Sequence, residues 1–221
     1  MNTVEVFDEL ARLYKDNGYS LYMIGSSSRD YLLSKAILDY DFVSDATPSE
    51  ALKFLDINKV ESSFIKYGVI KYKYSKDIKI DLVTLRKENN YKDFRHPNNI
   101  EFIKDINIDC KRRDFTINSI YIDINYNIID PTGLGISDLN NKILRCIGDP
   151  SIRFKDDPLR ILRGYRFAKE YNLTIEENTS KAMKEFEFLI KELNKDKIKF
   201  GIIPLFLAKG SIINSLFNKK L

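Results

Sequence analysis

Apolar and polar residues recur with two different periods in the first part of the chain, which predicts both helices and strands. Apolar residues have helical spacing over residues 4–17, and residues 21–24 are apolar enough for a buried strand. A second helix is expected over residues 49–55, with Thr47 as its N-cap. Residues 60–85 contain two further apolar segments separated by a polar turn. This part is therefore expected to form a sheet with flanking helices.

The pattern changes beyond these strands. Residues 87–111 are polar and contain turn signals, so they are expected to form a loop. A Pro-Gly turn at residues 130–135 precedes a boundary that divides the chain into residues 1–136 and residues 137–221. Within the second part, residues 179–195 show the periodicity of an amphipathic helix. A smaller helical domain is therefore expected after the sheet.

Composition and charge indicate an ordinary globular protein with one basic part. Hydrophobic residues make up 43% of the chain and charged residues 31%, which is typical of globular domains. The net charge of +4 is unevenly distributed, because residues 151–221 contain 15 Lys and Arg against 9 Asp and Glu, a net charge of +6. A basic second part suits contact with nucleic acid, and a solvated lysine-rich surface explains the charge equally well.

Three features narrow the class of protein further. No window approaches the roughly 18 apolar residues of a membrane span, and the N-terminus does not resemble a signal peptide. Cys110 and Cys146 lack the spacing of metal ligands, which favours a reduced, cytoplasmic protein. His96 is the single histidine, so this chain cannot form a multi-histidine zinc centre or an HD-type hydrolase centre. Its position before Pro97 favours a loop residue over a catalyst.

Residues 21–48 carry the most informative pattern, a strand, a tight turn, a short helix and a second strand. Gly25 ends the first strand with a residue that adopts positive φ without strain. The three serines Ser26–Ser28 offer hydroxyl groups and a helix N-cap before Arg29. The N–H groups at a helix start suit an anionic phosphate, and the Arg29 guanidinium adds a permanent positive charge.

Two carboxylates follow ten residues after that arginine. Asp39 and Asp41 are separated by Tyr40, and residues i and i+2 of a strand face the same side. Two like charges held side by side need a cation between them, and oxygen ligands of this kind suit Mg²⁺. Either motif alone is explained by an ordinary loop or a solvated edge. Together, at this spacing, they indicate phosphoryl or nucleotidyl transfer.

The segment GSSSRDYLLSKAILDYDFVSDATP, residues 25–48, resembles the signature of class II CCA-adding tRNA nucleotidyltransferases and bacterial poly(A) polymerases. Ser26 stands where this family commonly has a second glycine, and Ser28 where it has valine. The resemblance implies an α+β fold, in which a polymerase-beta-like nucleotidyltransferase head with a mixed sheet and flanking helices is followed by a short α-helical neck. The head would correspond to residues 1–136, and the neck, truncated relative to the family, to residues 137–221.

The resemblance also implies roles for individual residues. Nucleotide contacts would come from Gly25, Ser26 and Arg29, and a site for two Mg²⁺ ions would come from Asp39 and Asp41. A third carboxylate on the neighbouring strand commonly completes the metal site in this superfamily, and Asp81 is the candidate. The alternative for Asp81 is a structural role as the ion-pair partner of Arg86.

A second element, RRDFTINSIYID at residues 112–123, is close to the family's Arg-Arg-Asp-Phe-Thr-x-Asn-Ala element. The resemblance implies that Arg113 contacts the nucleotide phosphates or sugar, with Arg112, Asp114 and Asn118 in support. Composition alone would favour a surface salt-bridge cluster.

A third element, RFKDDPLRILRGYRFAKEY, covers residues 153–171. Pro158 suits the first turn of a helix, and Asp157 suits its N-cap. Helical spacing places Ile161, Leu162, Tyr165 and Ala168 on one face, and the three arginines on the other face are Arg160, Arg163 and Arg166. The element resembles the nucleotide-reading motif of the family, Asp/Glu-Asp-x-x-Arg. The resemblance implies that Asp157, Arg160 and Arg163 read the base and that Arg166 also belongs to the nucleotide site.

The chemistry of that motif follows from its hydrogen-bonding groups. The Asp157 carboxylate accepts a hydrogen bond from an exocyclic amine, while the Arg160 guanidinium donates to the neighbouring ring nitrogen. Cytosine and adenine both offer an amine beside an acceptor nitrogen, whereas guanine and uracil present the reverse. The pair would therefore admit CTP and ATP without a nucleic-acid template.

The implied reaction is template-independent transfer of CMP and AMP from CTP and ATP to an RNA 3′ end. CCA addition to tRNA is the first interpretation, and poly(A) or A-only addition is the second. A third is a nucleotide-binding subunit of a split enzyme that is inactive on RNA alone. The family normally continues into body and tail domains that bind the RNA. In this chain, a partner subunit or a homo-oligomer would provide that RNA binding.

Overall fold

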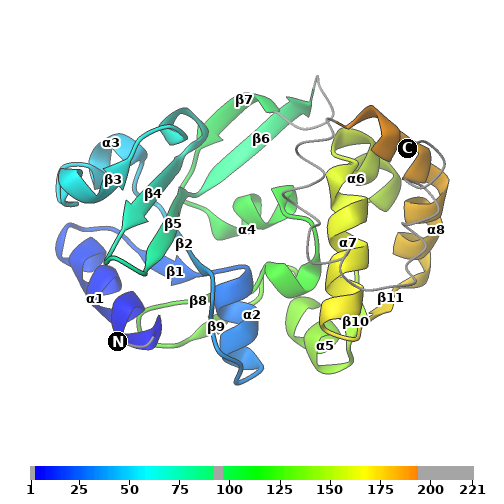
Figure 1. Cartoon of the computed structure of the whole chain (residues 1–221), viewed down its shortest axis with the longest axis horizontal. Helices are drawn as coiled ribbons and strands as arrows, with labels where there is room; N and C mark the ends of the chain where they lie inside the picture. Colours follow the sequence, from blue (N-terminus) through cyan, green and yellow to red (C-terminus); the bar gives the residue numbers. More distant parts are fainter. Residues whose placement is uncertain (1–2, 92–96, 194–221) are drawn as a thin grey trace. The chain divides into compact units, whose positions relative to one another are not determined.

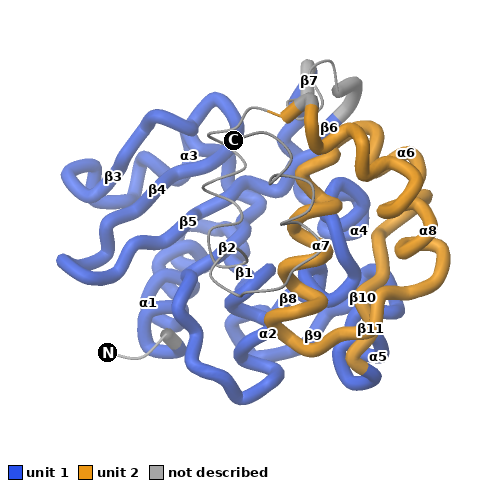
Figure 2. Tube along the Cα trace, turned by 45° about the vertical axis from the view of Figure 1, so that its right-hand side comes forward, with its two compact units in different colours: residues 1–90, 97–141 blue, residues 91–96, 142–221 orange. Residues whose placement is uncertain are grey.

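The computed structural model describes residues 3–91 and 97–193 of the 221-residue chain. The described residues form two compact units, one containing residues up to 90 and 97–141 and the other residue 91 and residues from 142 onward (Figure 2). The expectations for His96 and for residues 194–221 lie outside the described residues.

The first unit is built on a seven-stranded sheet with the strand order β3-β4-β5-β2-β1-β8-β9 (Figure 1). The strands are β1 (Leu21–Met23), β2 (Tyr40–Ser44), β3 (Val60–Glu61), β4 (Val69–Lys73), β5 (Lys79–Thr84), β8 (Tyr121–Ile122) and β9 (Ile128–Ile129). Strand β2 pairs parallel with β5 and antiparallel with β1, so the sheet is mixed. The helices of this unit are α1 (Thr3–Asp16), α2 (Ser26–Leu32), α3 (Pro48–Ala51), α4 (Ile106–Asp109) and α5 (Gly135–Asn140). The α+β prediction is confirmed.

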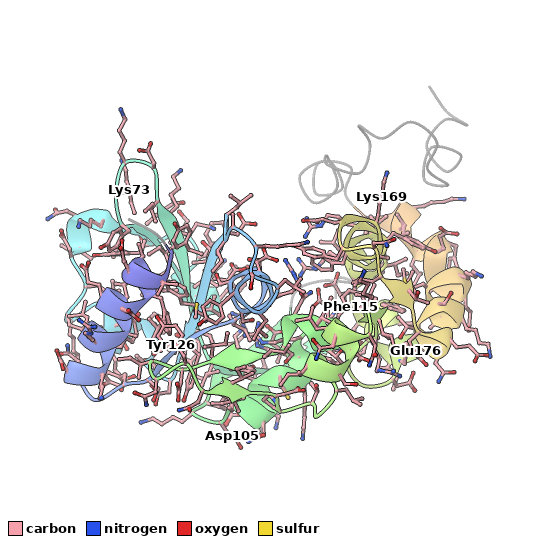
Figure 3. All side chains as sticks on the ribbon, turned by 90° about the horizontal axis from the view of Figure 1, so that it is seen from below. Lys73, Asp105, Phe115, Tyr126, Lys169 and Glu176 are labelled. Carbon is pink, nitrogen blue, oxygen red and sulfur yellow. The ribbon has the colours of Figure 1, made fainter. Side chains whose placement is uncertain are left out.

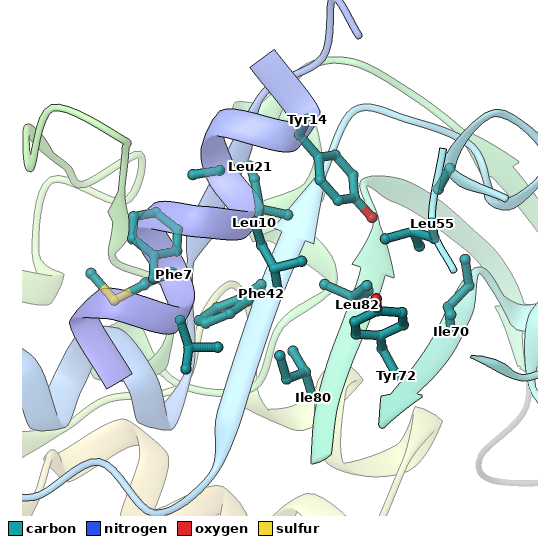
Figure 4. Packing of buried hydrophobic residues seen from close by; sticks show 14 of the residues in the cluster. Phe7, Leu10, Tyr14, Leu21, Phe42, Leu55, Ile70, Tyr72, Ile80 and Leu82 are labelled. Atoms are coloured by element: carbon teal, nitrogen blue, oxygen red, sulfur yellow. The ribbon is translucent and has the colours of Figure 1, made fainter. Parts of the chain in front are cut away.

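Alternation along the strands gives the sheet one apolar face and one mixed face. Helix α1 packs on the apolar face, where Phe7, Leu10 and Tyr14 are buried together with Phe42 of β2 and Leu82 of β5 (Figure 4). Phe42 and Leu82 are register partners, so they lie on the same face of neighbouring strands. The residues immediately before them therefore lie on the opposite face.

Side-chain hydrogen bonds fix two loops of the first unit. Thr47 caps α3 in a capping box, in which its side chain accepts a hydrogen bond from the Glu50 N–H and the Glu50 carboxylate accepts one from the Thr47 N–H, as predicted. The helix is shorter than expected and ends at Ala51. Tyr126, labelled in Figure 3, donates its hydroxyl to Asp8 of α1 at 2.6 Å, which ties the β8–β9 turn to that helix.

The expectation of a loop over residues 87–111 is wrong. Two strands, β6 (Arg86–Tyr91) and β7 (Pro97–Phe102), form a separate two-stranded sheet, and α4 follows them. Asn and Glu, which have low strand propensity, make up half of these two strands, so apolar alternation does not mark them. Arg86 stabilises the start of β6, because it donates to the Glu88 carboxylate and to the Tyr67 carbonyl, both at 2.8 Å.

The second unit is mainly helical. It contains β10 (Ile143–Leu144), α6 (Pro150–Asp156), α7 (Leu159–Glu170), β11 (Thr174–Ile175), α8 (Glu177–Phe186) and a 3₁₀ helix (Glu187–Glu192). Phe154, Ile161, Leu162 and Met183 from the three α-helices are fully buried. The amphipathic helix expected from residue 179 begins at Glu177, with Glu176 as its N-cap, and its α-helical part ends at Phe186. No helix of the described ranges is long and apolar enough to span a membrane.

Candidate active site

The turn between β1 and α2 is built on a glycine for two reasons. Gly25 has φ +64°, which L side chains rarely adopt. A Cβ at this position would lie 3.1 Å from Oδ2 of Asp41, so a side chain would crowd that carboxylate. Gly25 itself is the N-cap of α2, and the expected serine N-cap is wrong.

The serines after Gly25 hold the loop that carries the aspartates. The Ser26 hydroxyl donates to Oδ2 of Asp41 at 2.6 Å. The Ser27 hydroxyl donates to the Asp39 carbonyl at 2.9 Å and accepts the Asp41 N–H at 2.8 Å. Because the hydroxyls are used in this way, the start of α2 is tied to β2 rather than capped by its own side chains.

Asp39 and Asp41 flank Tyr40 where the chain enters β2. Asp41 is a strand residue, and Asp39 lies one residue before the strand and is exposed. Burial raises the pKa of the Asp41 carboxyl above its ordinary value, and the nearby charges of Asp81 and Asp39 raise it further, while hydrogen bonds from Ser26 lower it. A cation bound beside Asp41 would offset this repulsion and stabilise the ionised form of its carboxyl group.

Asp81 lies beside Asp41 on the neighbouring strand. The two are register partners in the parallel pair of β2 and β5, so their side chains leave the same face of the sheet. Asp81 forms an ion pair with Lys71 of β4, with Nζ 2.8 Å from Oδ1 and 3.1 Å from Oδ2. The alternative pairing of Asp81 with Arg86 is wrong, because Arg86 binds Glu88.

The predicted phosphate ligand Arg29 is buried inside the first unit. Its Nη1 donates to Oδ1 of Asn118 at 2.6 Å, and its Nε donates to Oδ1 of Asp30 at 3.2 Å. Arg29 therefore joins α2 to the segment that contains Asn118. Its contact with nucleotide stays a prediction.

Arg112 and Arg113 converge on a residue that sequence reasoning missed. Asp109 is fully buried and accepts from Nε of Arg112 at 2.8 Å, from Nε of Arg113 at 2.9 Å and from the Tyr121 hydroxyl at 2.7 Å. Burial alone would raise the pKa of Asp109, but Arg113 and Arg112, together with hydrogen bonds from the Arg86 N–H and the Tyr121 hydroxyl, hold it well below its ordinary value. The available signal was the i,i+4 spacing of Asp109 and Arg113. This cluster is an internal network rather than a surface salt bridge.

The second unit brings Asp157 and Arg160 together. Nε of Arg160 lies 3.5 Å from Oδ2 of Asp157, and the Asp157 carboxylate also accepts the Leu159 N–H at 3.2 Å. The guanidinium groups of Arg163 and Arg166 lie over the ring of Phe167, 5.4 and 4.8 Å from its centroid.

The N-cap expected for this helix is wrong. Asp157 is the C-cap of α6, and α7 begins at Leu159 with Pro158 as its N-cap. Arg160 is buried, although helical spacing places it opposite the apolar face. The break between α6 and α7 lies between Asp157 and Arg160, and the two side chains remain in contact across it.

The donor set in the first unit fits a hard divalent cation. Asp41 is a desolvated carboxylate beside two others, and carboxylate oxygens are the ligands that Mg²⁺ prefers. Within residues 3–91 and 97–193, however, no three His, Cys, Asp or Glu side chains are arranged to hold a metal together. The arrangement suits an ion held by two carboxylates whose other ligands come from substrate phosphates and water.

Comparison with known proteins identifies the family. Residues 21–145 match the model of the poly A polymerase head domain, which is more than half of the chain. The chain belongs to this family. Nucleotidyltransferases of this family generally depend on a divalent metal.

Curated relatives of this head-domain protein carry the name CCA-adding enzyme. The relative from Lactobacillus helveticus (strain DPC 4571) is 35% identical over 197 residues, which are 89% of this chain and 48% of the relative. The relative from Enterococcus faecalis (strain ATCC 700802 / V583) is 35% identical over 205 residues, 91% of this chain and 50% of the relative. The chain thus spans about half the length of the curated relatives it matches.

Solved structures agree with this assignment. The Bacillus stearothermophilus CCA-adding enzyme in complex with CTP has a TM-score of 0.80 at 25% identity, over 91% of this chain and 48% of that one. A tRNA nucleotidyltransferase complexed with a primer tRNA and an incoming ATP analog has a TM-score of 0.70 at 29% identity, over 90% of this chain and 56% of that one.

Proposed function

We propose that this chain catalyses template-independent transfer of CMP and AMP from CTP and ATP to the 3′ end of tRNA, which is CCA addition. The observation that carries the proposal is the group formed by Gly25, Ser26, Asp39 and Asp41, in which the serines after the glycine turn hold the Asp41 carboxylate and the Asp39 backbone carbonyl. Names and complexes of the relatives support the substrate class. The RNA 3′ oxygen attacks the α-phosphorus, the bond to the pyrophosphate breaks, and the hydroxyl proton passes to solvent.

Asp39 and Asp41 would hold two Mg²⁺ ions, with Asp81 as the third acid of the cluster. Bound Mg²⁺ activates the attacking hydroxyl and neutralises the triphosphate. The Ser26 hydroxyl keeps the Asp41 carboxylate oriented toward the turn. Gly25 leaves room for a triphosphate to approach the backbone, because its φ and its closeness to Asp41 exclude a side chain.

Residues of the second unit would select the base. The Asp157 carboxylate would accept a hydrogen bond from the exocyclic amine of the base, and the Arg160 guanidinium would donate one to the adjacent ring nitrogen. The two side chains already lie side by side, with Nε of Arg160 3.5 Å from Oδ2 of Asp157. Arg113 would reach the phosphates or sugar from its anchor on Asp109. We assign residues 1–136 as the head and residues 137–221 as a neck, a division that lies close to the boundary of the compact units. A cytoplasmic location suits the two free cysteines, Cys110 and Cys146.

The test is primer extension by the purified chain on tRNA that lacks its 3′ CCA, with each nucleoside triphosphate supplied separately in Mg²⁺. We expect incorporation from CTP and then ATP, and none from GTP or UTP. Incorporation from ATP alone would favour A-only or poly(A) addition, an alternative that the name of the matching head domain supports. Nucleotide binding without incorporation would favour a subunit that needs an RNA-binding partner or a second copy of the chain.

A further inference from the structure

Three charged side chains form a row across the centre of the sheet in the first unit. Asp41 of β2 is the register partner of Asp81 of β5, and Asp81 is the register partner of Lys71 of β4. Direct register partners project from the same face of neighbouring strands. The order across the face is therefore Asp41, Asp81, Lys71, with Asp39 at the entry to β2.

Lys71 holds both oxygens of Asp81. Its Nζ lies 2.8 Å from Oδ1 and 3.1 Å from Oδ2, and it also lies 5.7 Å from the centroid of the Phe64 ring. The ammonium is thus fixed by a two-oxygen ion pair and by an aromatic face. Both side chains are 39% exposed, so water and ions can reach the pair.

The other two carboxylates of the cluster differ from Asp81. Within the described ranges, neither Asp39 nor Asp41 forms an ion pair with a basic side chain. Oδ2 of Asp41 accepts from the Ser26 hydroxyl, which is a neutral donor and leaves the negative charge in place. Asp39 and Asp41 are therefore available to a cation from outside, whereas Asp81 already has one from within the chain.

We propose that Lys71 is a positioning residue that keeps Asp81 out of the metal coordination sphere, so that the divalent ion is held by Asp39 and Asp41. This inference rests on the proposed function. It accounts for the absence, within residues 3–91 and 97–193, of three acidic side chains arranged around one metal position. It also assigns a role to a lysine that sequence analysis did not single out. Lys71 lowers the negative charge beside the ion without adding a ligand.

The proposal is tested by Mn²⁺ binding, titrated by electron paramagnetic resonance at pH 7 on the whole chain without nucleotide. Three variants are compared with the wild type: Lys71→Met, Asp81→Asn combined with Lys71→Met, and Asp41→Asn. The double variant removes a carboxylate and an ammonium together, so the net charge near the ion stays the same. Circular dichroism melting checks that each variant is folded, and Lys71→Gln replaces Lys71→Met if the apolar side chain unfolds the chain.

If Asp81 is not a ligand, the double variant binds Mn²⁺ within about 2-fold of the wild type. Lys71→Met alone binds roughly 3–10-fold more tightly, because a positive charge near the ion is removed and Asp81 is released toward it. If the double variant binds Mn²⁺ at least 10-fold more weakly than the wild type, Asp81 is a ligand. That result overturns this inference and leaves the proposed function standing. Unchanged Mn²⁺ affinity in Lys71→Met also overturns the inference. If this variant then binds CTP more weakly in EDTA, Lys71 contacts the nucleotide phosphates instead.

Asp41→Asn separates this inference from the proposed function. We expect it to weaken Mn²⁺ binding by at least 10-fold. Unchanged binding would show that the ion is not held by these carboxylates, and both the proposed metal site and the inference would then fail together.

Discussion

The buried carboxylate of Asp109 provides the sharpest test of how the first unit is held together. We consider Asp109→Asn, which keeps the shape of the side chain and removes its charge. The Asp109 carboxylate accepts hydrogen bonds from the side chains of Arg112, Arg113 and Tyr121 and from the backbone N–H of Arg86. No part of Asp109 is exposed. The variant removes one carboxylate from two largely buried guanidinium groups, of which Arg112 keeps a contact with Glu88, whose Oε1 lies 3.5 Å from its Nη1.

The magnitude follows from the burial of that network. Removing one partner of a buried, hydrogen-bonded ion pair typically costs about 3–5 kcal/mol, because the remaining charge is left uncompensated. For a chain of this size, a loss of that order corresponds to a fall in the melting temperature of roughly 6–20 °C. The matched control is Asp105→Asn on the same helix, since Asp105 is an exposed N-cap and asparagine caps equally well. We expect the control to change stability by less than about 0.5 kcal/mol.

The pH dependence has a defined sign. The pKa of Asp109 is lowered in the folded protein, so its contribution to stability is present above its unfolded pKa of about 3.9 and is lost as the pH falls toward its folded pKa. Urea unfolding, followed by circular dichroism at pH 7 and pH 3, should show a large difference between wild type and variant at pH 7 and a smaller one at pH 3. A difference below about 1 kcal/mol at pH 7, or one equal to that of Asp105→Asn, would refute the reasoning.

Three further predictions follow from single contacts. Thr47→Ala removes the capping box of α3 and should destabilise the first unit by about 1 kcal/mol in urea unfolding, whereas Thr47→Ser should restore most of the loss. Gly25→Ala places a Cβ in a backbone with φ +64° and 3.1 Å from Oδ2 of Asp41, so it should cost roughly 1–3 kcal/mol and weaken Mn²⁺ binding; unchanged values for both would contradict the role given to this turn. Arg160→Ala should reduce the preference for CTP and ATP over UTP and GTP in nucleotide binding, and an unchanged preference would show that Arg160 does not read the base.

Most of the first unit could be predicted because its signals are local. The helix over residues 4–17 was evident from apolar periodicity, and the strand that ends at Gly25 was evident from its apolar run and its glycine. Thr47 was evident from capping chemistry. The strands over residues 86–91 and 97–102 were not predictable, because polar residues of low strand propensity dominate both.

The candidate site was predictable where its residues are close in sequence. Ser26, Asp39 and Asp41 could be placed together because only the glycine turn, α2 and a short loop separate the two adjacent strands β1 and β2. The ion pair of Lys71 with Asp81 depends on strand register, which a single sequence does not specify. The convergence of Arg112 and Arg113 on Asp109 depends on burial, and composition alone favoured an exposed cluster.

The most direct test of the central claim is incorporation of CMP from labelled CTP into tRNA that lacks its 3′ CCA. The purified chain is assayed in Mg²⁺ as wild type, as Asp41→Asn, and as Asp77→Asn, a control that makes the same chemical change in the exposed β4–β5 turn. We predict incorporation by the wild type and the control, and a fall to below about one tenth of that rate in Asp41→Asn, because a lost metal ligand removes stabilisation of the transferring phosphoryl group. Equal incorporation by all three would contradict the claim that these carboxylates carry out nucleotidyl transfer.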